Sequence, residues 1–291
     1  MISIIVPAHN ESSVIARTLG AITDGAMSDE LEVIVVCNGC SDDTASVARR
    51  CGPLVRVIET ETARKTHALN MGDRAARGFP RVYLDADVMI DLSGIRTLVK
   101  RLEMADVQVV APIAQVDLTG CSWAVRAFYE IRSYLPSAKE GIGGSGVYAL
   151  SESGRRRFGD FPEVTADDGY VRIQFHPRER ETLLCVKSTV FPPRTLKDLI
   201  ATKTRSHYGS FELAKEFPDP WKNRGESNHH SIARLFKNPS LWPSLVAYVW
   251  VTILARRRAR KRFGRAGLVW ERDNTSRLQP RPATSCPKAN S

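Results

Sequence analysis

The first 111 residues alternate short apolar runs with segments of helical periodicity, and this pattern limits the fold more than any other feature. The apolar runs do not alternate with polar residues, which is typical of strands buried on both faces. Such strands, separated by helices, form a mostly parallel sheet flanked by helices in an α/β fold. The expected strands are 2–6, 31–36, 54–58, 82–85 and 107–111. The expected helices are 11–22, 41–50, 65–77 and 92–102.

The second half of the chain is less regular. We expect a helix over 122–135, a glycine-rich loop over 141–146, a strand over 147–150, a helix over 167–175, a strand over 182–190 and a helix over 195–217. One α/β domain should cover residues 1–217, with a nucleotide-binding half at 1–115 and an acceptor half at 116–217. A helical, basic segment at 218–272 and a disordered tail at 273–291 should follow.

Two acidic residues, separated by one residue, lie at the end of the fourth expected strand. Because side chains alternate along a strand, Asp85 and Asp87 point to the same side and can meet just past the strand end. Ligands bind at the carboxyl ends of the strands in open α/β sheets. Two carboxylates there suit a divalent cation that keeps several waters and also holds a substrate diphosphate. The alternative is a surface turn with two solvated carboxylates.

Three further polar segments follow the first three expected strands. They are residues 7–11, residues 38–44 and the start of the helix at Lys65. Parallel strands place their carboxyl ends at one edge, so all these segments should meet where nucleotides bind in such folds. Asn10 and Ser41 have a second interpretation as N-caps of the helices after them. Lys65 has a second interpretation as an ordinary solvated side chain.

The order and spacing of these motifs over residues 1–210 resemble those of the family 2 glycosyltransferases, which have the GT-A fold. The resemblance implies a nucleotide-diphosphate-sugar donor of the UDP or GDP type and a divalent cation, Mg²⁺ or Mn²⁺. It implies that Asp87 coordinates the cation, that Asp85 meets the ribose and metal, and that Lys65 approaches the base or phosphate. The other donor-binding residues that it implies are Pro7, Ala8, Asn10, Glu11, Asn38, Asp42, Ala86, Gly144 and Arg205. Many relatives carry an aspartate where this chain has Cys37 or Asn38, so the base of the donor stays open.

A second acidic pair resembles the family's Glu/Asp-Asp motif. By that resemblance Asp168 is the general base and Asp167 supports it. An acceptor hydroxyl that attacks a sugar must lose its proton as the new bond forms, which a nearby carboxylate assists. Adjacent carboxylates raise each other's pKa, whereas the start of a helix opposes that shift. Ordinary charges at a helix start are the alternative.

Residues 203–208 match a basic motif of the family only in part, because the tryptophan position does not align. Arg205 is expected to face the diphosphate, since a guanidinium fork suits that geometry. His207 is the candidate for a further metal ligand or a phosphate contact, ahead of His229 and His230, with a structural histidine as the alternative. The loop at 141–146 would border the donor sugar and the acceptor, or form an ordinary tight turn.

The positive charge is concentrated near the C-terminal end. Residues 251–291 hold 11 Lys or Arg against Glu271 and Asp273, so nearly all of the net charge of +10 lies there. The uncharged run 240–255 is shorter than the roughly 20 residues that span a bilayer. We predict an interfacial segment whose arginines contact anionic lipid headgroups, with a core helix and a solvated tail as the alternative. The expected location is the cytoplasmic face of the cell membrane, because no signal sequence precedes the first strand.

The six cysteines are scattered through a chain of this length, which favours reduced thiols over a disulfide framework. Cys37 and Cys40 form a C-x-x-C motif, but the second pair that a zinc site would need is missing.

The pattern favours a metal-dependent glycosyltransferase of the inverting class, acting on the hydroxyl of a lipid-linked or other amphipathic acceptor. One alternative is a nucleotidyltransferase, which would normally show a glycine-rich loop after the first strand, whereas 7–11 contains no glycine. Another is a non-catalytic membrane protein that binds a nucleotide or sugar. A dinucleotide oxidoreductase is disfavoured by the missing G-x-G-x-x-G motif, and no nucleic acid partner is expected.

Overall fold

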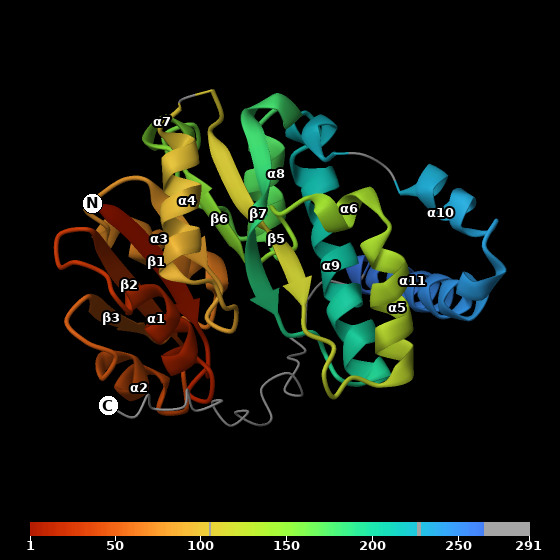
Figure 1. The fold of residues 1–291 in the computed structure, drawn as a ribbon, viewed down its shortest axis with the longest axis horizontal. Coiled ribbons are helices and arrows are strands. Elements are labelled where there is room, and N and C mark those ends of the chain that lie inside the picture. The colour runs from red at the N-terminus through yellow and green to blue at the C-terminus, as the bar shows by residue number, and fades with distance from the viewer. Residues whose placement is uncertain (105, 226–227, 265–291) are drawn as a thin grey trace, which may run out of the picture.

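The protein has one central sheet with helices on both faces and further helices beyond one edge (Figure 1). The computed structural model describes residues 1–104, 106–225 and 228–264. The sheet order is β3-β2-β1-β4-β6-β5-β7, and β6 alone among these strands runs antiparallel to its neighbours. The strands are β1 Ile2–Ala8, β2 Leu31–Asn38, β3 Val55–Thr60, β4 Arg81–Leu84, β5 Val109–Val116, β6 Val147–Leu150 and β7 Arg180–Val190. The predicted mostly parallel sheet is confirmed.

The helices lie between and after these strands. In the first half they are α1 Ile15–Thr23, α2 Thr44–Arg49, α3 Lys65–Ala75 and α4 Leu92–Leu102. In the second half they are α5 Trp123–Ser133, α6 Pro136–Lys139, α7 Glu152–Arg155, α8 Asp167–Gln174, α9 Leu196–Glu216, α10 His229–Leu235 and α11 Trp242–Phe263. Short 3₁₀ turns cover Pro177–Glu179, Pro220–Asn223 and Pro239–Leu241.

Both faces of the sheet are covered by apolar side chains, as the continuous apolar strands require. On one face α1, α2 and α4 pack against alternate residues of β1 and β2, such as Ile4 and Val33. On the other face α3, α8 and α9 pack against Ile5, Tyr83 and neighbouring side chains. Every residue of β1 and β2 is therefore buried. The two layers fix the carboxyl ends of these strands at one edge.

The reversed direction of β6 brings the glycine-rich loop to that same edge. Val147, the first residue of β6, pairs with Leu84, the last residue of β4. Gly146 has a φ of 65°, and a Cβ there would lie 2.5 Å from Val88 Cγ2, so only glycine fits without displacement. The Asp85 N–H donates to the Gly146 carbonyl at 2.9 Å. The glycine-rich loop before β6 thus contacts the turn after β4.

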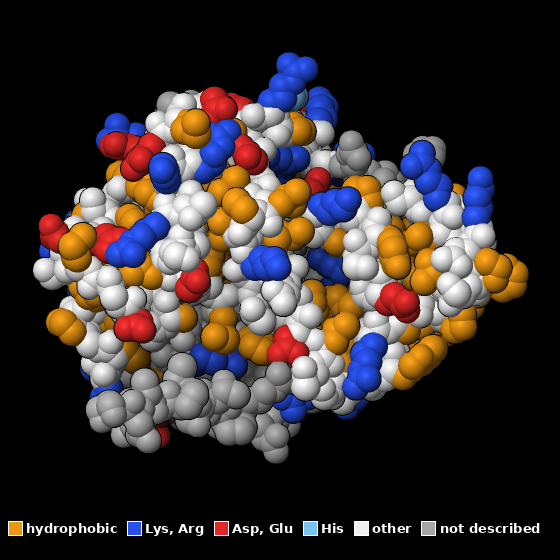
Figure 2. Space-filling model, in the orientation of Figure 1, with side chains coloured by type: hydrophobic (Ala, Val, Ile, Leu, Met, Phe, Trp, Pro, Cys, Tyr) orange, Lys and Arg blue, Asp and Glu red, His pale blue; other side chains and the backbone are white. Residues whose placement is uncertain are grey.

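The last helices add a separate apolar cluster beyond β7. Helix α11 packs against α5 and α9 through buried side chains that include Leu245, Tyr248 and Val251. The opposite side of α11 leaves Val246 and Trp250 exposed. Figure 2 shows hydrophobic side chains gathered at the end of the molecule where Figure 1 places α10 and α11. Within the described part of the chain, no helix has both the length and the apolar character needed to cross a bilayer.

Two predicted helix caps are wrong, because both helices begin later than expected. Helix α1 begins at Ile15, and Asn10 adopts a left-handed conformation with a φ of 55°. The Asn10 Oδ1 accepts a hydrogen bond from the Ser41 N–H at 2.6 Å, so it joins two loops. Helix α2 begins at Thr44, whose N–H donates to Asp42 Oδ1 at 3.0 Å, so Ser41 does not cap it.

Other boundaries differ from the predictions by a few residues. Strand β4 ends at Leu84, so Asp85 lies in the following turn. Within the segment 218–272, expected to be helical, residues 218–230 contain only a 3₁₀ turn and the start of α10 among those that the structure describes. Free thiols are found at Cys37, Cys40, Cys51, Cys121 and Cys185. Cys286 and the predicted disordered tail 273–291 lie outside the described residues.

Candidate active site

Two adjoining cavities lie at the carboxyl edge of β1, β2 and β4. The first, here called the edge cavity, has a volume of about 420 Å³ and extends from the loop ends of these strands to the start of α8. The second, the helical cavity, has a volume of about 810 Å³ and extends from the glycine-rich loop to α5, α9 and α11. Asp85, Asp87 and Asp168 line both cavities. These three carboxylates therefore stand at the boundary between two spaces.

The turn after β4 directs two carboxylates into the cavities. Ala86 and Val88 are buried in the core, and Thr18 Oγ1 donates to the Ala86 carbonyl at 2.9 Å. Asp85 and Asp87, which alternate with them, are half-buried and line both cavities. The sequence alternation thus continues through the turn, and the apolar pair anchors the acidic pair at the cavity wall.

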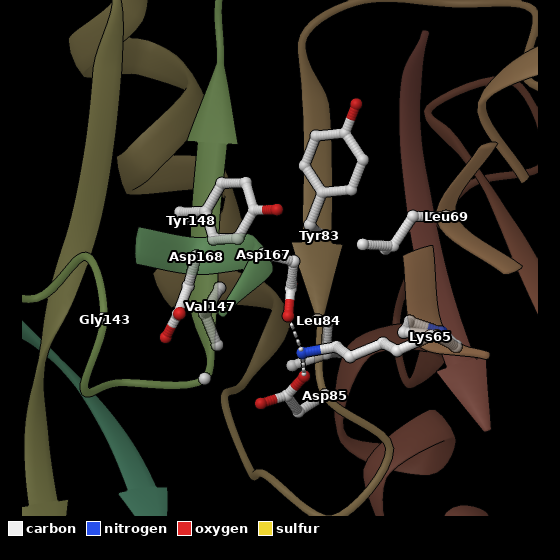
Figure 3. Close-up of a pocket in the computed structure, with 12 residues that line it drawn as sticks. Lys65, Leu69, Tyr83, Leu84, Asp85, Gly143, Val147, Tyr148, Asp167 and Asp168 are labelled. Carbon is white, nitrogen blue, oxygen red and sulfur yellow. Dashed lines mark ion pairs between the residues drawn. The ribbon is translucent and has the colours of Figure 1, made fainter. Parts of the chain in front are cut away.

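Lys65 lies between two carboxylates at the start of α3 (Figure 3). Its Nζ is 2.7 Å from Asp85 Oδ1 and 3.0 Å from Asp167 Oδ1. Burial opposes the charged form of Lys65, but the charges of Asp167, Asp85 and Asp168 outweigh it and raise the lysine pKa above its usual value. Lys65 therefore stays cationic in this site and is held by carboxylates.

Asp167 is the most buried acidic group of the site. Burial raises the pKa of its carboxyl from 3.8 to about 6, although the charge of Lys65 opposes this and that of Asp168 adds to it. The hydroxyl of Tyr148 is buried nearby and has no hydrogen-bond partner among the described residues. Asp167 is thus nearly buried at the wall of the edge cavity and held by Lys65, which fits a supporting group.

Asp168 lies on the side of Asp167 away from Lys65, nearer the glycine-rich loop (Figure 3). Its Oδ2 would be 3.8 Å from a Cβ at Gly143, and its Oδ1 accepts from the Gly169 N–H at 2.6 Å. It is half-buried and borders both cavities. Gly144 lines the helical cavity beside it. Of the two neighbouring acids, Asp168 is the more exposed and lines both cavities, whereas Asp167 lines only the edge cavity.

The loops after β1 and β2 contribute unevenly to the edge cavity. Pro7, Glu11 and Asn38 line it, as does Ala86. Ala8, Asn10 and Asp42 do not line either cavity. Ala8 is fully buried in the core, because β1 extends through it. Asp42 accepts from the Ser12 N–H at 3.2 Å, so its position and that of Asn10 stabilise the joined loops behind the cavity wall.

Three basic residues of α9 line the helical cavity: Lys203, Arg205 and His207. Arg205 lines both cavities, whereas His207 lines only the helical one. Burial and the charges of Arg256 and Lys203 lower the pKa of His207 to about 4, so its imidazole is neutral near pH 7. The prediction that His207 binds a metal or phosphate stays a prediction. The side chains of His229 and His230 lie outside what the structure describes.

The arrangement agrees with what comparison with known proteins finds. Residues 3–146 match the model of glycosyl transferase family 2. These residues belong to glycosyl transferase family 2. The match runs from β1 through the glycine-rich loop, and so includes Asp85 and Asp87 but ends before Asp167 and Asp168.

Two curated glycosyltransferases, both longer than this chain, are similar to part of the family 2 domain. Glycosyltransferase AglD of Haloferax volcanii is 30% identical over 118 residues, which are 36% of this chain and 18% of AglD. The uncharacterized glycosyltransferase EpsJ of Bacillus subtilis is 26% identical over 143 residues, 48% of this chain and 38% of EpsJ. The chain thus spans less than half the length of these curated relatives.

Solved structures share the GT-A fold across most of the chain. The mannosyltransferase PcManGT of Pyrobaculum calidifontis, solved with GDP-Man and Mn²⁺, is 25% identical with a TM-score of 0.58, covering 92% of this chain and 76% of that one. Glucosyl-3-phosphoglycerate synthase of Mycobacterium tuberculosis, solved with Mn²⁺, UDP and glucosyl-3-phosphoglycerate, is 22% identical with a TM-score of 0.54, covering 74% and 79% of the two chains. At 22% identity, the similarity to the synthase shows a shared fold only.

The acidic pair of the family 2 domain fits a divalent cation. Mg²⁺ is commonly held by one or two carboxylates together with substrate phosphates and water. Asp85 and Asp87 supply two such oxygen donors at one wall. No group of three or more His, Cys, Asp or Glu side chains that could hold a metal is found among residues 1–104, 106–225 and 228–264. The available donor set is therefore that of a cation shared with a diphosphate.

Several cavity residues were missed by sequence reasoning. His9, whose Nδ1 lies 2.5 Å from the Asn38 carbonyl, lines both cavities of the family 2 site. Arg132 and Lys203 face the helical cavity from α5 and α9. His9 lies within the polar segment 7–11 that follows the first strand, so its place at the cavity could have been predicted from the sequence. The other two could not, because which side of a helix faces a cavity depends on tertiary packing.

Proposed function

We propose that this chain is a metal-dependent glycosyltransferase that moves a sugar from a UDP or GDP sugar to an acceptor hydroxyl. The observation that carries the proposal is the position of Asp168 across from Asp85 and Asp87, where all three line the same two cavities. Sugar transfer needs a metal-binding group beside the leaving diphosphate and a base beside the attacking hydroxyl. Asp85 and Asp87 could serve the first role and Asp168 the second.

The edge cavity would hold the nucleotide part of the donor. Pro7 and Asn38 form walls from β1 and β2, in the position where open α/β sheets bind nucleotides. Arg205 borders both cavities and offers a guanidinium for the diphosphate. Asp85 and Asp87 would hold Mg²⁺ or Mn²⁺, which stabilises the negative charge that the departing nucleoside diphosphate gains.

Asp168 would act as the general base. The acceptor oxygen forms a bond to the anomeric carbon while the bond from that carbon to the diphosphate breaks, and the electron pair leaves with the diphosphate. The acceptor proton passes to the Asp168 carboxylate. A single displacement of this kind inverts the anomeric configuration, because the acceptor attacks opposite the leaving group. Asp167, paired with Lys65, would keep its neighbour in position.

The acceptor would enter through the helical cavity beside a membrane surface. Exposed Trp242, Val246 and Trp250 lie along α11, which continues into exposed arginines such as Arg257. Apolar side chains next to cations suit the interface of an anionic bilayer. We therefore extend the proposal to a peripheral enzyme at the cytoplasmic face of the membrane, with a lipid-linked or other amphipathic acceptor.

Thermal stabilisation by nucleotide sugars, measured with and without Mn²⁺, tests the proposal. UDP or GDP sugars should raise the melting temperature, and Mn²⁺ should enlarge the rise because ligand binding to the folded state stabilises it. Asp87→Asn should abolish the Mn²⁺-dependent part, whereas Asp29→Asn, at an exposed carboxylate in the turn before β2, should not. Indifference of the wild-type protein to every nucleotide sugar would refute the proposal. Binding without sugar transfer to any acceptor would favour the non-catalytic alternative.

A further inference from the structure

Two cations from different helices meet in the helical cavity. Lys203 lies on α9, and its Nζ is 5.5 Å from the ring centres of both Phe128 and Tyr129 on α5. Arg132 lies one turn further along α5, and its Nη2 would be 3.3 Å from a Cβ at Gly144. The side chain of Arg132 thus lies beside the glycine-rich loop, near enough to Lys203 for its charge to act on the ammonium group.

These two cations have no acidic partner in the described part of the chain. No hydrogen bond or ion pair joins Lys203 or Arg132 to another described residue, although most other buried cations here are paired, as Arg81 is with Asp73. The nearest acid on α5, Glu130, accepts from Ser244 Oγ at 2.5 Å instead. A half-buried positive pair without a counter-charge is costly unless an anion joins it.

The surroundings of Lys203 favour an anion beside it. Burial, together with the charges of Arg132 and Arg205, lowers the pKa of Lys203 well below its usual value. The aromatic rings beside its Nζ keep the charge in surroundings where Coulomb interactions are stronger than in water. An anion placed between Lys203 and Arg132 would reverse this destabilisation of the ammonium form.

We propose that Arg132 and Lys203 form a binding site for a phosphate group carried by the acceptor. A guanidinium fork and an ammonium point charge are the two side-chain groups that bind phosphate oxygens best. The pair lines the helical cavity and not the edge cavity, so it lies on the acceptor side of Asp168. The aromatic surface of Phe128 and Tyr129 would contact the organic part of the same molecule. This assignment rests on the proposed function.

Calorimetric binding of two phosphate probes to the full chain tests the site. Glycerol 3-phosphate in solution represents a soluble acceptor, and a long-chain alkyl phosphate in neutral detergent micelles represents a lipid. Whichever probe binds, Lys203→Gln and Arg132→Gln should each weaken binding at least about tenfold, as loss of a charge-assisted hydrogen bond predicts. Binding of one probe and not the other identifies the source of the phosphate.

Matched variants on the same helices serve as controls. Lys197→Gln on α9 and Arg126→Gln on α5 remove exposed charges outside the cavity and should bind the probes like the wild type. Lys203→Arg keeps the charge and should retain most of the binding, which separates loss of charge from loss of folding. Failure of both probes to bind the wild-type protein would overturn the proposal.

Binding of the donor distinguishes this inference from the proposed function. The affinity for UDP or GDP sugar in the presence of Mn²⁺ should stay within about twofold in Lys203→Gln, since the pair faces only the acceptor side. An equal loss of donor affinity would assign the pair to the donor diphosphate and overturn the inference. If the wild type bound no nucleotide sugar, the proposed function would fail, while phosphate binding by the pair would still be measurable.

Discussion

Lys65 Nζ lies 3.0 Å from Asp167 Oδ1, and this ion pair joins the start of α3 to the start of α8 across the edge of the sheet. The same ammonium lies 2.7 Å from Asp85 Oδ1. One cation therefore ties the turn after β4, which contributes Asp85, to the helix that carries the candidate base Asp168.

Replacement of Lys65 by methionine should destabilise the protein. Asp167 would be left buried without its ion-pair partner, and leaving a buried polar group unsatisfied costs about 1–3 kcal/mol. We expect a loss of about 2 kcal/mol in the free energy of unfolding, measured by urea denaturation. Lys100→Met, at an exposed position of α4, is the matched control and should change stability little.

The double variant Lys65→Met/Asp167→Asn separates the pair from the two side chains. If the ion pair is the source of the loss, the double variant should be more stable than the sum of the single losses predicts, by at least about 1 kcal/mol. Strict additivity of the three measured values would show that Lys65 and Asp167 do not act together.

The stability of the protein should carry a pH signature of Asp167. Its pKa is raised from 3.8 to about 6 in the folded protein, so between these values the folded state keeps a proton that the unfolded state has lost. Protonation of Asp167 therefore stabilises the fold at low pH, and this contribution is lost as the pH rises through 6. The full change is at most about 3 kcal/mol.

Comparison with Asp167→Asn isolates this contribution from other groups. Acids such as Glu30 and Glu179, whose pKa values are lowered to about 2, change stability in the opposite direction. The stability of the wild type minus that of Asp167→Asn should fall between pH 4 and pH 6, as measured by thermal melts across the range. A flat difference for Asp167 would contradict its raised pKa.

The sheet could be predicted from sequence because its strands are read from local patterns. Continuous apolar runs at β1 and β2 and the helical periodicity of α4 specify buried parallel strands with covering helices. Helix starts were less predictable, because the loops after β1 and β2 are held to each other. Asn10 and Asp42 bond across or within these loops, and no local pattern distinguishes that role from capping.

Site residues at the ends of strands could be predicted from the sequence, whereas those placed by the packing of helices could not. Asp85, Asp87, Lys65 and Asn38 reach one cavity because parallel strands end together. The expectation that Lys65 approaches the donor stays a prediction. The structure pairs Lys65 with Asp85 and with Asp167, and the second contact joins segments about 100 residues apart, which no local pattern indicates. The cations facing the helical cavity depend on how α5, α9 and α11 pack, which periodicity alone does not specify.

Asp168→Asn should remove the general base and leave donor binding intact. The amide has nearly the same shape but cannot accept the acceptor proton, so the turnover number should fall by about 10²–10⁴-fold. Stabilisation by nucleotide sugar with Mn²⁺ should persist, because Asp85 and Asp87 are unchanged. Turnover is measured as release of nucleoside diphosphate, with Asp29→Asn as the control. Activity within a few fold of the wild type would exclude Asp168 as the base.

Membrane binding by the exposed face of α11 can be tested without removing the helix. Deletion from residue 240 onward would also expose the apolar cluster that Leu245, Tyr248 and Val251 form with α5 and α9, so loss of membrane binding could reflect misfolding. Val246 and Trp250 are 70% and 52% exposed and point away from that cluster. Val246→Ser/Trp250→Ser should therefore leave the melting temperature nearly unchanged.

The same double variant should bind anionic liposomes at least about tenfold more weakly in sedimentation assays, because it loses two apolar side chains that would enter the interface. Met104→Ser, at another exposed apolar residue after α4, should sediment like the wild type. High salt should weaken binding of all three proteins if the arginines of α11 also contact the lipid headgroups, since screening reduces attraction between exposed charges. Sedimentation of the double variant equal to that of the wild type would show that this face of α11 does not contact the membrane.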